Sequence, residues 1–357
     1  MPNSAGDHDP VLRVHGYHQL RIKQVVRETD DARSYILDIP SELAEIFRYR
    51  PGQFCTFRVR IGGDEQLRSY SMSSAPETDS DLTVTVKRVA GGLVSNWMLD
   101  NLSDGDLLEL TKPAGVFCPQ ETERPVMALC GGSGITPVMS IAKHVLTTTQ
   151  RPVKLLYANR DRGSVIFDQA LTKLSDRHPG RMELVSHFDS DTGFLTADAV
   201  ADFARRGLDA DFYICGPGPF MDLVESALRD LGVEPGRIFI ERFLVAQQEK
   251  DAQALAGSAD VTTQVPAHVT VILAGKTTVI DYRAGDTVLE TARRGGLHPP
   301  FSCEAGNCAT CMAFLKSGSV TMRANNALTD EEVEEGWILT CQSLPSGQDA
   351  IVEYEAM

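Results

Sequence analysis

The chain has 357 residues, which is too long for one ordinary hydrophobic core and predicts two or three domains. Its apolar content of 42% and charged content of 23% are typical of a water-soluble globular protein. The formal net charge of −15 argues against nucleic acid or an anionic membrane surface as a partner. The N-terminus lacks the apolar run of a signal peptide and no stretch is long enough to cross a membrane, so we expect a cytoplasmic protein.

Short strands separated by turns are predicted for residues 11–122, after a tail of about ten residues with a disordered composition. Turns are marked by Pro51-Gly52, Gly62-Gly63 and Asp104-Gly105. Alternating or β-branched residues predict strands over 20–26, 34–39, 53–61, 67–71 and 82–88. Many short strands at this spacing indicate a β-barrel, with one short helix that begins near Ser95.

The pattern changes to alternating strands and helices over residues 123–244. A helix is predicted from about Pro137, where a glycine-rich turn ends. The predicted strands are 125–130, 152–158, 182–188, 211–215 and 237–240. This alternation indicates an α/β domain with a parallel sheet.

A linker and a small third domain are predicted for the rest of the chain. Residues 245–266 are polar and rich in Ala, Gln, Asp and Ser, which is typical of an interdomain linker. The segment 267–357 is predicted to begin with a hairpin over 269–273 and 277–282, followed by a helix over 288–294.

Four cysteines in this last segment have the spacing of a metal site. Cys303, Cys308 and Cys311 follow the pattern C-x4-C-x2-C, and Cys341 comes farther along. This is the ligand spacing of a plant-type [2Fe–2S] cluster, which needs four thiolates. A zinc site would more often show two short C-x2-C pairs, and only one is present. We therefore predict that these four cysteines bind iron, which implies a reducing compartment.

The motif Arg68-Ser69-Tyr70-Ser71 lies at the end of a predicted strand and suggests a flavin site. An arginine fork can pair with a diphosphate, a tyrosine ring offers a flat face, and Ser71 could hydrogen-bond a flavin ring. Gly91-Gly92 precedes the predicted helix of the barrel, whose N-terminus would present free N–H groups to the same diphosphate. An ordinary amphipathic strand is the alternative for the tetrapeptide alone.

Two glycine-containing turns follow predicted strands of the α/β segment. The first, residues 130–137 with the sequence CGGSGITP, is not a G-x-G-x-x-G fingerprint, but its glycines would let the backbone approach a pyrophosphate. The second is Cys215-Gly216-Pro217-Gly218. A buried small hydrophobic residue is the alternative for Cys215, and the turn directly after it favours a functional role.

Together these elements resemble the ferredoxin–NADP reductase superfamily fused to a C-terminal plant-type [2Fe–2S] ferredoxin. The resemblance implies a multidomain fold with an FAD-binding β-barrel, an NAD-binding α/β domain and an α+β (β-grasp) ferredoxin domain. It implies FAD contacts for Arg68, Ser69, Tyr70, Ser71, Lys87, Gly92, Val94 and Ser95. It implies nucleotide contacts for Gly131, Gly132, Gly134, Thr136, Asn159, Arg160, Cys215, Gly216 and Pro217. It implies catalytic positions at Ser71, Cys215, Glu241 and Phe243, with Cys215 beside the nicotinamide and the Phe243 ring shielding the flavin.

The choice between NADH and NADPH is predicted to depend on the loop after the second strand of the α/β segment. Arg160 and Arg162 could bind a 2′-phosphate, whereas Asp161 would repel it. Solvated arginines are the simpler interpretation of this loop. We therefore expect NADH as the electron donor, with NADPH as the less favoured alternative.

The order of the three predicted sites suggests an electron-transfer chain. A hydride carries two electrons and a [2Fe–2S] cluster accepts one, so a flavin between them predicts transfer from NADH to FAD, to the cluster and to an external acceptor. A reductase followed by a ferredoxin is the order in reductase components of two-component oxygenases. Segments 157–161, 164–167 and 212–221 further resemble reductases of 3-ketosteroid 9α-hydroxylases, which implies a terminal Rieske-type oxygenase as partner and a role in steroid degradation.

Other functions are compatible with the same sequence features. A reductase subunit of phenylacetyl-CoA epoxidase or of another ring-hydroxylating oxygenase has the same domain order. A stand-alone NADH or flavin oxidase is a second alternative. The segment from His268 onward has twelve acidic and six basic residues, and Asp330-Glu331-Glu332 with Glu334-Glu335 forms an acidic run. A solvated helix start is the default for such a run, and we predict that this face docks the oxygenase.

Overall fold

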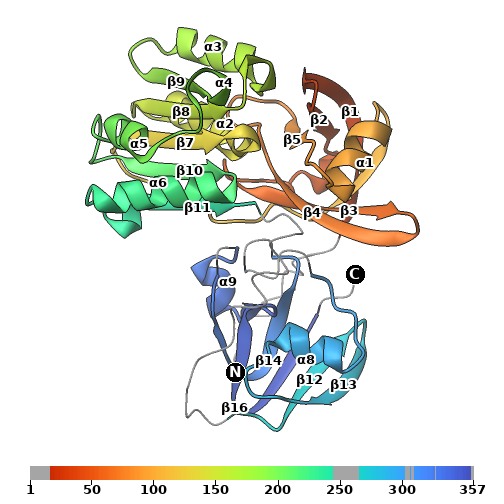
Figure 1. Ribbon diagram of the computed structural model, residues 1–357. Helices are drawn as coiled ribbons and strands as arrows, with labels where there is room; N and C mark the ends of the chain where they lie inside the picture. The colour runs from red at the N-terminus through yellow and green to blue at the C-terminus, as the bar shows by residue number, and fades with distance from the viewer. Residues whose placement is uncertain (1–16, 244–264, 302–305, 307–308, 326, 355–357) are drawn as a thin grey trace, which may run out of the picture.

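The computed structural model describes residues 17–243, 265–301, 306, 309–325 and 327–354, which form three β-sheets (Figure 1). The predicted tail and, apart from residues 265 and 266, the predicted linker lie outside the described residues. Within the described ranges, no helix combines the length and the apolar character that crossing a membrane requires.

The first sheet is an antiparallel barrel of six strands in the order β4-β3-β6-β1-β2-β5. The strands are β1 (His18–Thr29), β2 (Ala32–Asp38), β3 (Phe54–Ile61), β4 (Asp64–Ser71), β5 (Leu82–Lys87) and β6 (Leu107–Leu110). A bridge between Met72 and Val84 brings the two edge strands together. Each strand predicted for this segment is present, and β6 is additional because its four residues are too few to display an alternating pattern.

The helix α1 (Leu93–Asn101) covers the barrel and buries Val94, Met98 and Leu99 in the same core as Tyr35 and Phe57. Its N-cap residue, Gly92, supplies no side-chain hydrogen bond to the first turn. The first backbone N–H groups of α1 therefore lack a side-chain cap, as a helix N-terminus that binds an anion requires.

The second sheet is parallel, with the order β11-β10-β7-β8-β9. Its strands are β7 (Val126–Gly131), β8 (Val153–Asn159), β9 (Met182–Phe188), β10 (Asp211–Gly216) and β11 (Ile238–Arg242). Its helices are α2 (Ile135–Thr148), α3 (Asp168–Arg177), α4 (Asp189–Thr192), α5 (Ala197–Ala204) and α6 (Gly218–Asp230). From β7 the chain adds β8 and β9 on one side of the sheet and then crosses to add β10 and β11 on the other side. The strand order therefore reverses between β7 and β10, which is the switch point of the sheet.

The parallel sheet separates two hydrophobic cores, and successive residues of a strand point to opposite cores. Met127 and Leu129 of β7 pack with residues of α5 and α6 on one face. Val126 and Ala128 pack on the other face with residues of α2 and α3, together with Phe117 from the barrel side. The helix α2 begins at Ile135, two residues before the predicted start, and Pro137 lies in its first turn, where an N–H group is not needed.

The third sheet is mixed, with the order β13-β12-β16-β14-β15, and β12 and β16 are parallel. Its strands are β12 (His268–Leu273), β13 (Lys276–Asp281), β14 (Met312–Met322), β15 (Trp337–Leu339) and β16 (Ser343–Glu353). The helices α8 (Val288–Arg294) and α9 (Asp330–Glu334) both begin with a capping box. The predicted hairpin and the predicted helix over 288–294 are confirmed. In Figure 1 this sheet lies below the other two.

Candidate electron-transfer site

The two glycine turns of the α/β domain lie against each other at the switch point of the sheet. A Cβ atom on Gly134 would lie 2.0 Å from the carbonyl oxygen of Cys215, and one on Gly216 would lie 3.0 Å from the backbone nitrogen of Gly131. A side chain at Gly134 would overlap this carbonyl group, and one at Gly216 would be in unusually tight contact. Two motifs that are far apart in sequence therefore form one surface of exposed backbone groups, which suits a dinucleotide pyrophosphate.

Ser71 connects the barrel to this surface. Its hydroxyl, at the end of β4, donates a hydrogen bond of 3.3 Å to Oε1 of Glu241. Glu241 lies on β11 directly beside Cys215 of β10. Three of the four predicted catalytic residues are thus neighbours, and the fourth, Phe243, packs against the core that includes Cys215.

The carboxyl group of Glu241 is in an unusual environment. Its Oε2 atom is buried and has no hydrogen-bond partner among the described residues. Burial raises the pKa of Glu241 to about 8, and the hydrogen bond from Ser71 acts in the opposite direction. The carboxyl group is therefore mainly protonated at neutral pH, which leaves a neutral hydrogen-bond donor between the barrel and the nucleotide turns.

The thiol of Cys215 is buried and neutral. Burial raises its pKa well above the ordinary value, and the neighbouring Glu241 and Cys130 raise it further. A thiol in this state is a poor nucleophile. Cys215 can therefore pack against a bound ring, and covalent chemistry at its sulfur is disfavoured.

The barrel residues predicted to contact FAD gather near the end of β4 and the start of α1. The guanidinium of Arg68 donates 2.6 Å to the carbonyl of Leu67. The ring of Tyr70 lies edge-on to Phe57 with centroids 5.6 Å apart, and burial raises the pKa of Tyr70. Ser95 accepts a hydrogen bond from the backbone of Val89, and Val94 is buried. An arginine near the end of β4 and a helix N-terminus without a side-chain cap are both groups that suit a diphosphate.

Lys87 lies between the barrel and the first glycine turn. Its ammonium group is 4.0 Å from Asp31 and would be 3.6 Å from a Cβ atom on Gly132. Thr136, at the start of α2, is buried and donates its hydroxyl to the carbonyl of Ser133. Lys87 is therefore directed toward the nucleotide turn as well as belonging to the flavin barrel.

The end of β8 carries a buried amide, that of Asn159. Asn159 is 4% exposed, and neither its amide nitrogen nor its amide oxygen has a hydrogen-bond partner of normal geometry in the described ranges. Buried polar groups are usually hydrogen-bonded, so this amide suits a bound ligand. The next residue, Arg160, pairs with Asp161 at 2.9 Å, and Arg162 pairs with Asp191 at 3.0 Å.

Two of the four predicted iron ligands lie together, and the other two, Cys303 and Cys308, lie outside the described residues. The backbone N–H of Cys341 points to the sulfur of Cys311 at 3.5 Å. Gly306 has a φ of +76°, and a Cβ atom there would lie 2.8 Å from the carbonyl oxygen of Ala324. Buried, adjacent sulfurs with an N–H···S contact and a loop glycine packed beside them fit a [2Fe–2S] cluster.

The cluster loop contacts β3, the neighbour of the strand that carries the flavin motif. The hydroxyl of Thr310, next to Cys311, lies 3.4 Å from the hydroxyl of Thr56 on β3. Thr56 is also hydrogen-bonded at 2.9 Å to Ser69, so Ser69 is directed toward the ferredoxin domain. The roles of Thr56 and Thr310 could not be predicted from the sequence, because a threonine on a strand and one in a loop carry no signal that they meet.

Comparisons with known proteins agree with this arrangement. Family models match residues 19–118 (oxidoreductase FAD-binding domain), 128–226 (oxidoreductase NAD-binding domain) and 271–346 (2Fe-2S iron-sulfur cluster binding domain). The ferredoxin reductase component of 3-ketosteroid-9-alpha-monooxygenase from Mycolicibacterium smegmatis is 40% identical over 344 residues, covering 94% of this chain and 97% of the relative. The chain belongs to the family of oxygenase reductase components.

Other members of this family differ in the reaction that they serve. One component of the 1,2-phenylacetyl-CoA epoxidase from Escherichia coli is 32% identical, covering 95% of this chain and 98% of the relative. The solved structure of phthalate dioxygenase reductase matches with 25% identity and a TM-score of 0.59, covering 95% of this chain and 98% of that chain. These matches confirm the predicted superfamily, the three-domain fold, the oxidoreductase class and the cofactors FAD, a pyridine nucleotide and a [2Fe–2S] cluster.

Proposed function

We propose that this reductase component takes electrons from NADH and delivers them to a terminal Rieske-type oxygenase that hydroxylates 3-ketosteroids. The observation that best supports this route is that the paired strands β3 and β4 are hydrogen-bonded to both the nucleotide side and the cluster loop. Ser71 reaches the nucleotide side through Glu241, and Ser69 reaches the cluster loop through Thr56 and Thr310. When bound, FAD would accept a hydride and release its electrons one at a time to the cluster.

The residues of the chain would act by binding and orienting these groups. Arg68, with Gly92, Val94 and Ser95 at the start of α1, would hold the flavin diphosphate, and Tyr70 would pack against the flavin. Gly131, Gly132, Gly134, Gly216 and Pro217 would approach the nucleotide with their backbone, and Lys87, Thr136, Asn159 and Arg160 would contact it. The neutral Cys215 would pack against the nicotinamide, and Phe243 would cover the flavin. Cys303, Cys308, Cys311 and Cys341 would bind the iron.

The preference for NADH is supported by the state of the two arginines near the end of β8. Both are already paired with carboxylates, Arg160 with Asp161 and Arg162 with Asp191. The guanidinium of Arg162 also lies over the ring of Phe188 at 4.3 Å. A 2′-phosphate would have to displace these carboxylates and would meet their negative charge, so NADPH should bind more weakly.

The steroid assignment of the partner rests on the 40% identity to the mycobacterial reductase component, compared with 32% for the epoxidase component. The need to keep the cluster thiolates reduced supports the cytoplasm as its location. The acidic run is proposed to dock the oxygenase, but Glu332 is excluded from this docking surface because it pairs with the barrel. Glu332 pairs with Lys112 of the barrel at 3.7 Å, whereas Asp330, Glu331 and Glu334 are exposed.

The test of the proposed function is anaerobic reduction of the holoprotein by NADH, followed by absorbance. The flavin should bleach first and the cluster second, and adding an oxidised 3-ketosteroid oxygenase should then reoxidise both. Bleaching of the flavin alone would instead favour a stand-alone oxidase. Efficient reoxidation by an epoxidase oxygenase, with none by the steroid oxygenase, would reassign the partner. Charge reversal at Glu331 and Glu334 should slow only the step that needs the partner.

A further inference from the structure

We propose that Arg151, Asp211 and Tyr213 are positioning residues for hydride transfer. They hold residues 117–125, the connector between the barrel and the α/β domain, and so fix where Cys215 lies relative to Ser71. We call these three residues the interdomain clasp. The inference rests on the proposed function, because it concerns the geometry of the same nucleotide site.

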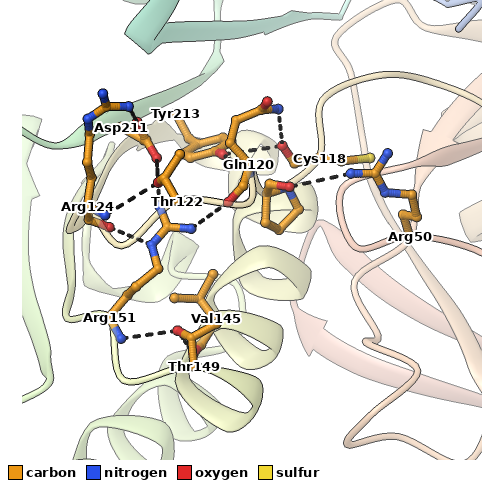
Figure 2. Close-up of polar contacts among 11 residues, drawn as sticks. Arg50, Cys118, Gln120, Thr122, Arg124, Val145, Thr149, Arg151, Asp211 and Tyr213 are labelled. Atoms are coloured by element: carbon orange, nitrogen blue, oxygen red, sulfur yellow. Dashed lines mark hydrogen bonds and ion pairs between the residues drawn. The ribbon is translucent and has the colours of Figure 1, made fainter.

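Arg151 binds the connector at two places. It precedes β8, its side chain is 2% exposed, and Figure 2 shows its guanidinium among carbonyl groups of the connector. Nη1 donates 2.8 Å to the carbonyl of Gln120, and Nε donates to the carbonyl of Arg124. Nη2 donates 2.7 Å to Oδ2 of Asp211. One planar group thus joins the connector to the first residue of β10.

Asp211 adds a second set of contacts at the same point. Its side chain is 1% exposed, and its Oδ2 also accepts a hydrogen bond of 2.6 Å from the hydroxyl of Thr122. Its Oδ1 lies 3.6 Å from a guanidinium nitrogen of Arg124. Buried charges are tolerated only when they are paired and hydrogen-bonded, so this arrangement favours one position of the connector over others.

Tyr213 holds the connector farther along. Its hydroxyl accepts a hydrogen bond of 3.0 Å from the backbone of Gln120 and donates one of 3.2 Å to the carbonyl of Cys118. Its ring stacks on Phe239 with centroids 4.9 Å apart and meets Phe117 edge-on at 5.5 Å. Burial raises the pKa of Tyr213 to about 12, so the hydroxyl remains a donor at neutral pH.

Two of the three clasp residues, Asp211 and Tyr213, lie on β10, the strand that also carries Cys215. Asp211, Tyr213 and Cys215 are every second residue of β10, so their side chains lie on the same face of the sheet. At roughly 3.3 Å per residue, Asp211 and Cys215 are ~13 Å apart along the strand. A change of about 5° in the direction of β10 about its clasped end would move Cys215 by ~1 Å. A displacement of this size can slow a reaction by on the order of 100-fold.

The barrel holds the connector from the opposite side. Arg50 donates 3.5 Å to the carbonyl of Pro119, and a Cβ atom on Gly52, whose φ is +91°, would lie 1.9 Å from the carbonyl oxygen of Phe117. A separate contact between the two domains joins Lys143 of α2 to Asp79 at 3.0 Å. The hydroxyl of Ser140 on the same helix donates to the carbonyl of Ser74. Loss of the clasp would therefore leave the α/β domain attached mainly through contacts such as these, about which it could turn.

The test compares two clasp variants with one control in the holoprotein. Tyr213→Phe removes one hydroxyl and keeps the ring contacts. Arg151→Lys keeps the positive charge but removes the planar guanidinium that donates to the connector and to Asp211. Tyr35→Phe is the matched control, because the Tyr35 hydroxyl is buried in the barrel without a hydrogen-bond partner in the described ranges. The readouts are the rate of flavin reduction at saturating NADH, the NADH–flavin charge-transfer absorbance, the isotope effect with deuterated NADH, and FAD content.

We expect flavin reduction to slow by about 10-fold in Tyr213→Phe and on the order of 100-fold in Arg151→Lys. The charge-transfer absorbance should weaken and the isotope effect should rise, while FAD content and reduction by dithionite stay as in the wild type and the control. Wild-type rates in both variants would overturn the proposal, as would rate losses that only follow loss of FAD. If Arg151→Lys does not fold, Tyr213→Phe decides alone. Failure of NADH to reduce the wild-type flavin would instead refute the proposed function.

Discussion

Replacing Glu241 with glutamine should stabilise the protein, and the gain should grow as the pH rises. Burial raises the pKa of the Glu241 carboxyl group from 4.5 to about 8 in the folded protein. The folded protein therefore holds this proton at pH values at which the unfolded chain has released it. The free energy of unfolding must then fall as the pH rises between these two values. Glutamine stays neutral and keeps a carbonyl oxygen that can accept the hydrogen bond from Ser71.

The size of the effect follows from the pKa difference. One pKa unit corresponds to about 1.4 kcal/mol, so the full difference corresponds to roughly 5 kcal/mol. The advantage of Glu241→Gln should be close to zero below about pH 4.5 and about 3 kcal/mol at pH 7. It should reach its maximum above pH 8, where the folded wild-type protein must hold a buried carboxylate.

The assay is urea unfolding of the holoproteins near pH 5 and near pH 8, followed by the rise in flavin fluorescence as FAD leaves the barrel. Glu234→Gln is the control, because the Glu234 side chain is 77% exposed on the same domain. This control should change the free energy of unfolding by less than about 0.5 kcal/mol at either pH. An equal gain for Glu241→Gln at both pH values, or a loss at high pH, would refute the argument that a buried, protonated carboxyl group occupies this position.

Three further predictions concern the cluster, the nucleotide turn and the choice of donor. Cys341→Ser should lower cluster-dependent electron transfer by at least about 100-fold and leave reduction of the flavin by NADH unchanged, as stopped-flow absorbance would show. Gly134→Ala should slow flavin reduction by on the order of 100-fold, because the added Cβ atom would push the two glycine turns apart. The control is Gly236→Ala, whose Cβ atom would meet nothing within 4 Å and which should leave the rate of flavin reduction unchanged. Asp161→Asn should release Arg160 and raise the ratio of kcat/KM for NADPH to that for NADH by about 10-fold, measured by dye reduction.

Each of these predictions can fail in a distinct way. Loss of flavin reduction in Cys341→Ser would show that the cluster and the hydride site are not separable. Equal losses in the two glycine variants would point to a general cost of alanine in place of close contact between the turns. An unchanged donor preference in Asp161→Asn would mean that Arg160 does not reach the 2′ position of the nucleotide.

The cofactors could be predicted from the sequence because the physical requirements of their sites are local. Four thiolates at cluster spacing, glycines where a backbone must approach a phosphate, and an arginine at a strand end are each visible within a short stretch. The same holds for the strands of the barrel and for the helix over 288–294, whose capping box is four residues long. The strand β6 was missed because four residues are too few to show a period.

Only the tertiary structure decided how these sites are joined. The contact from Thr310 to Thr56 and on to Ser69, and the pair between Arg151 and Asp211, join residues that are far apart in the chain. No local pattern predicts such contacts, because they depend on the paths of the strands between them. The raised pKa of Glu241 has the same origin, since a carboxyl group acquires it only when surrounding elements exclude water. The sequence alone therefore determined which cofactors this chain can bind, and the packing of its domains determined their order of contact.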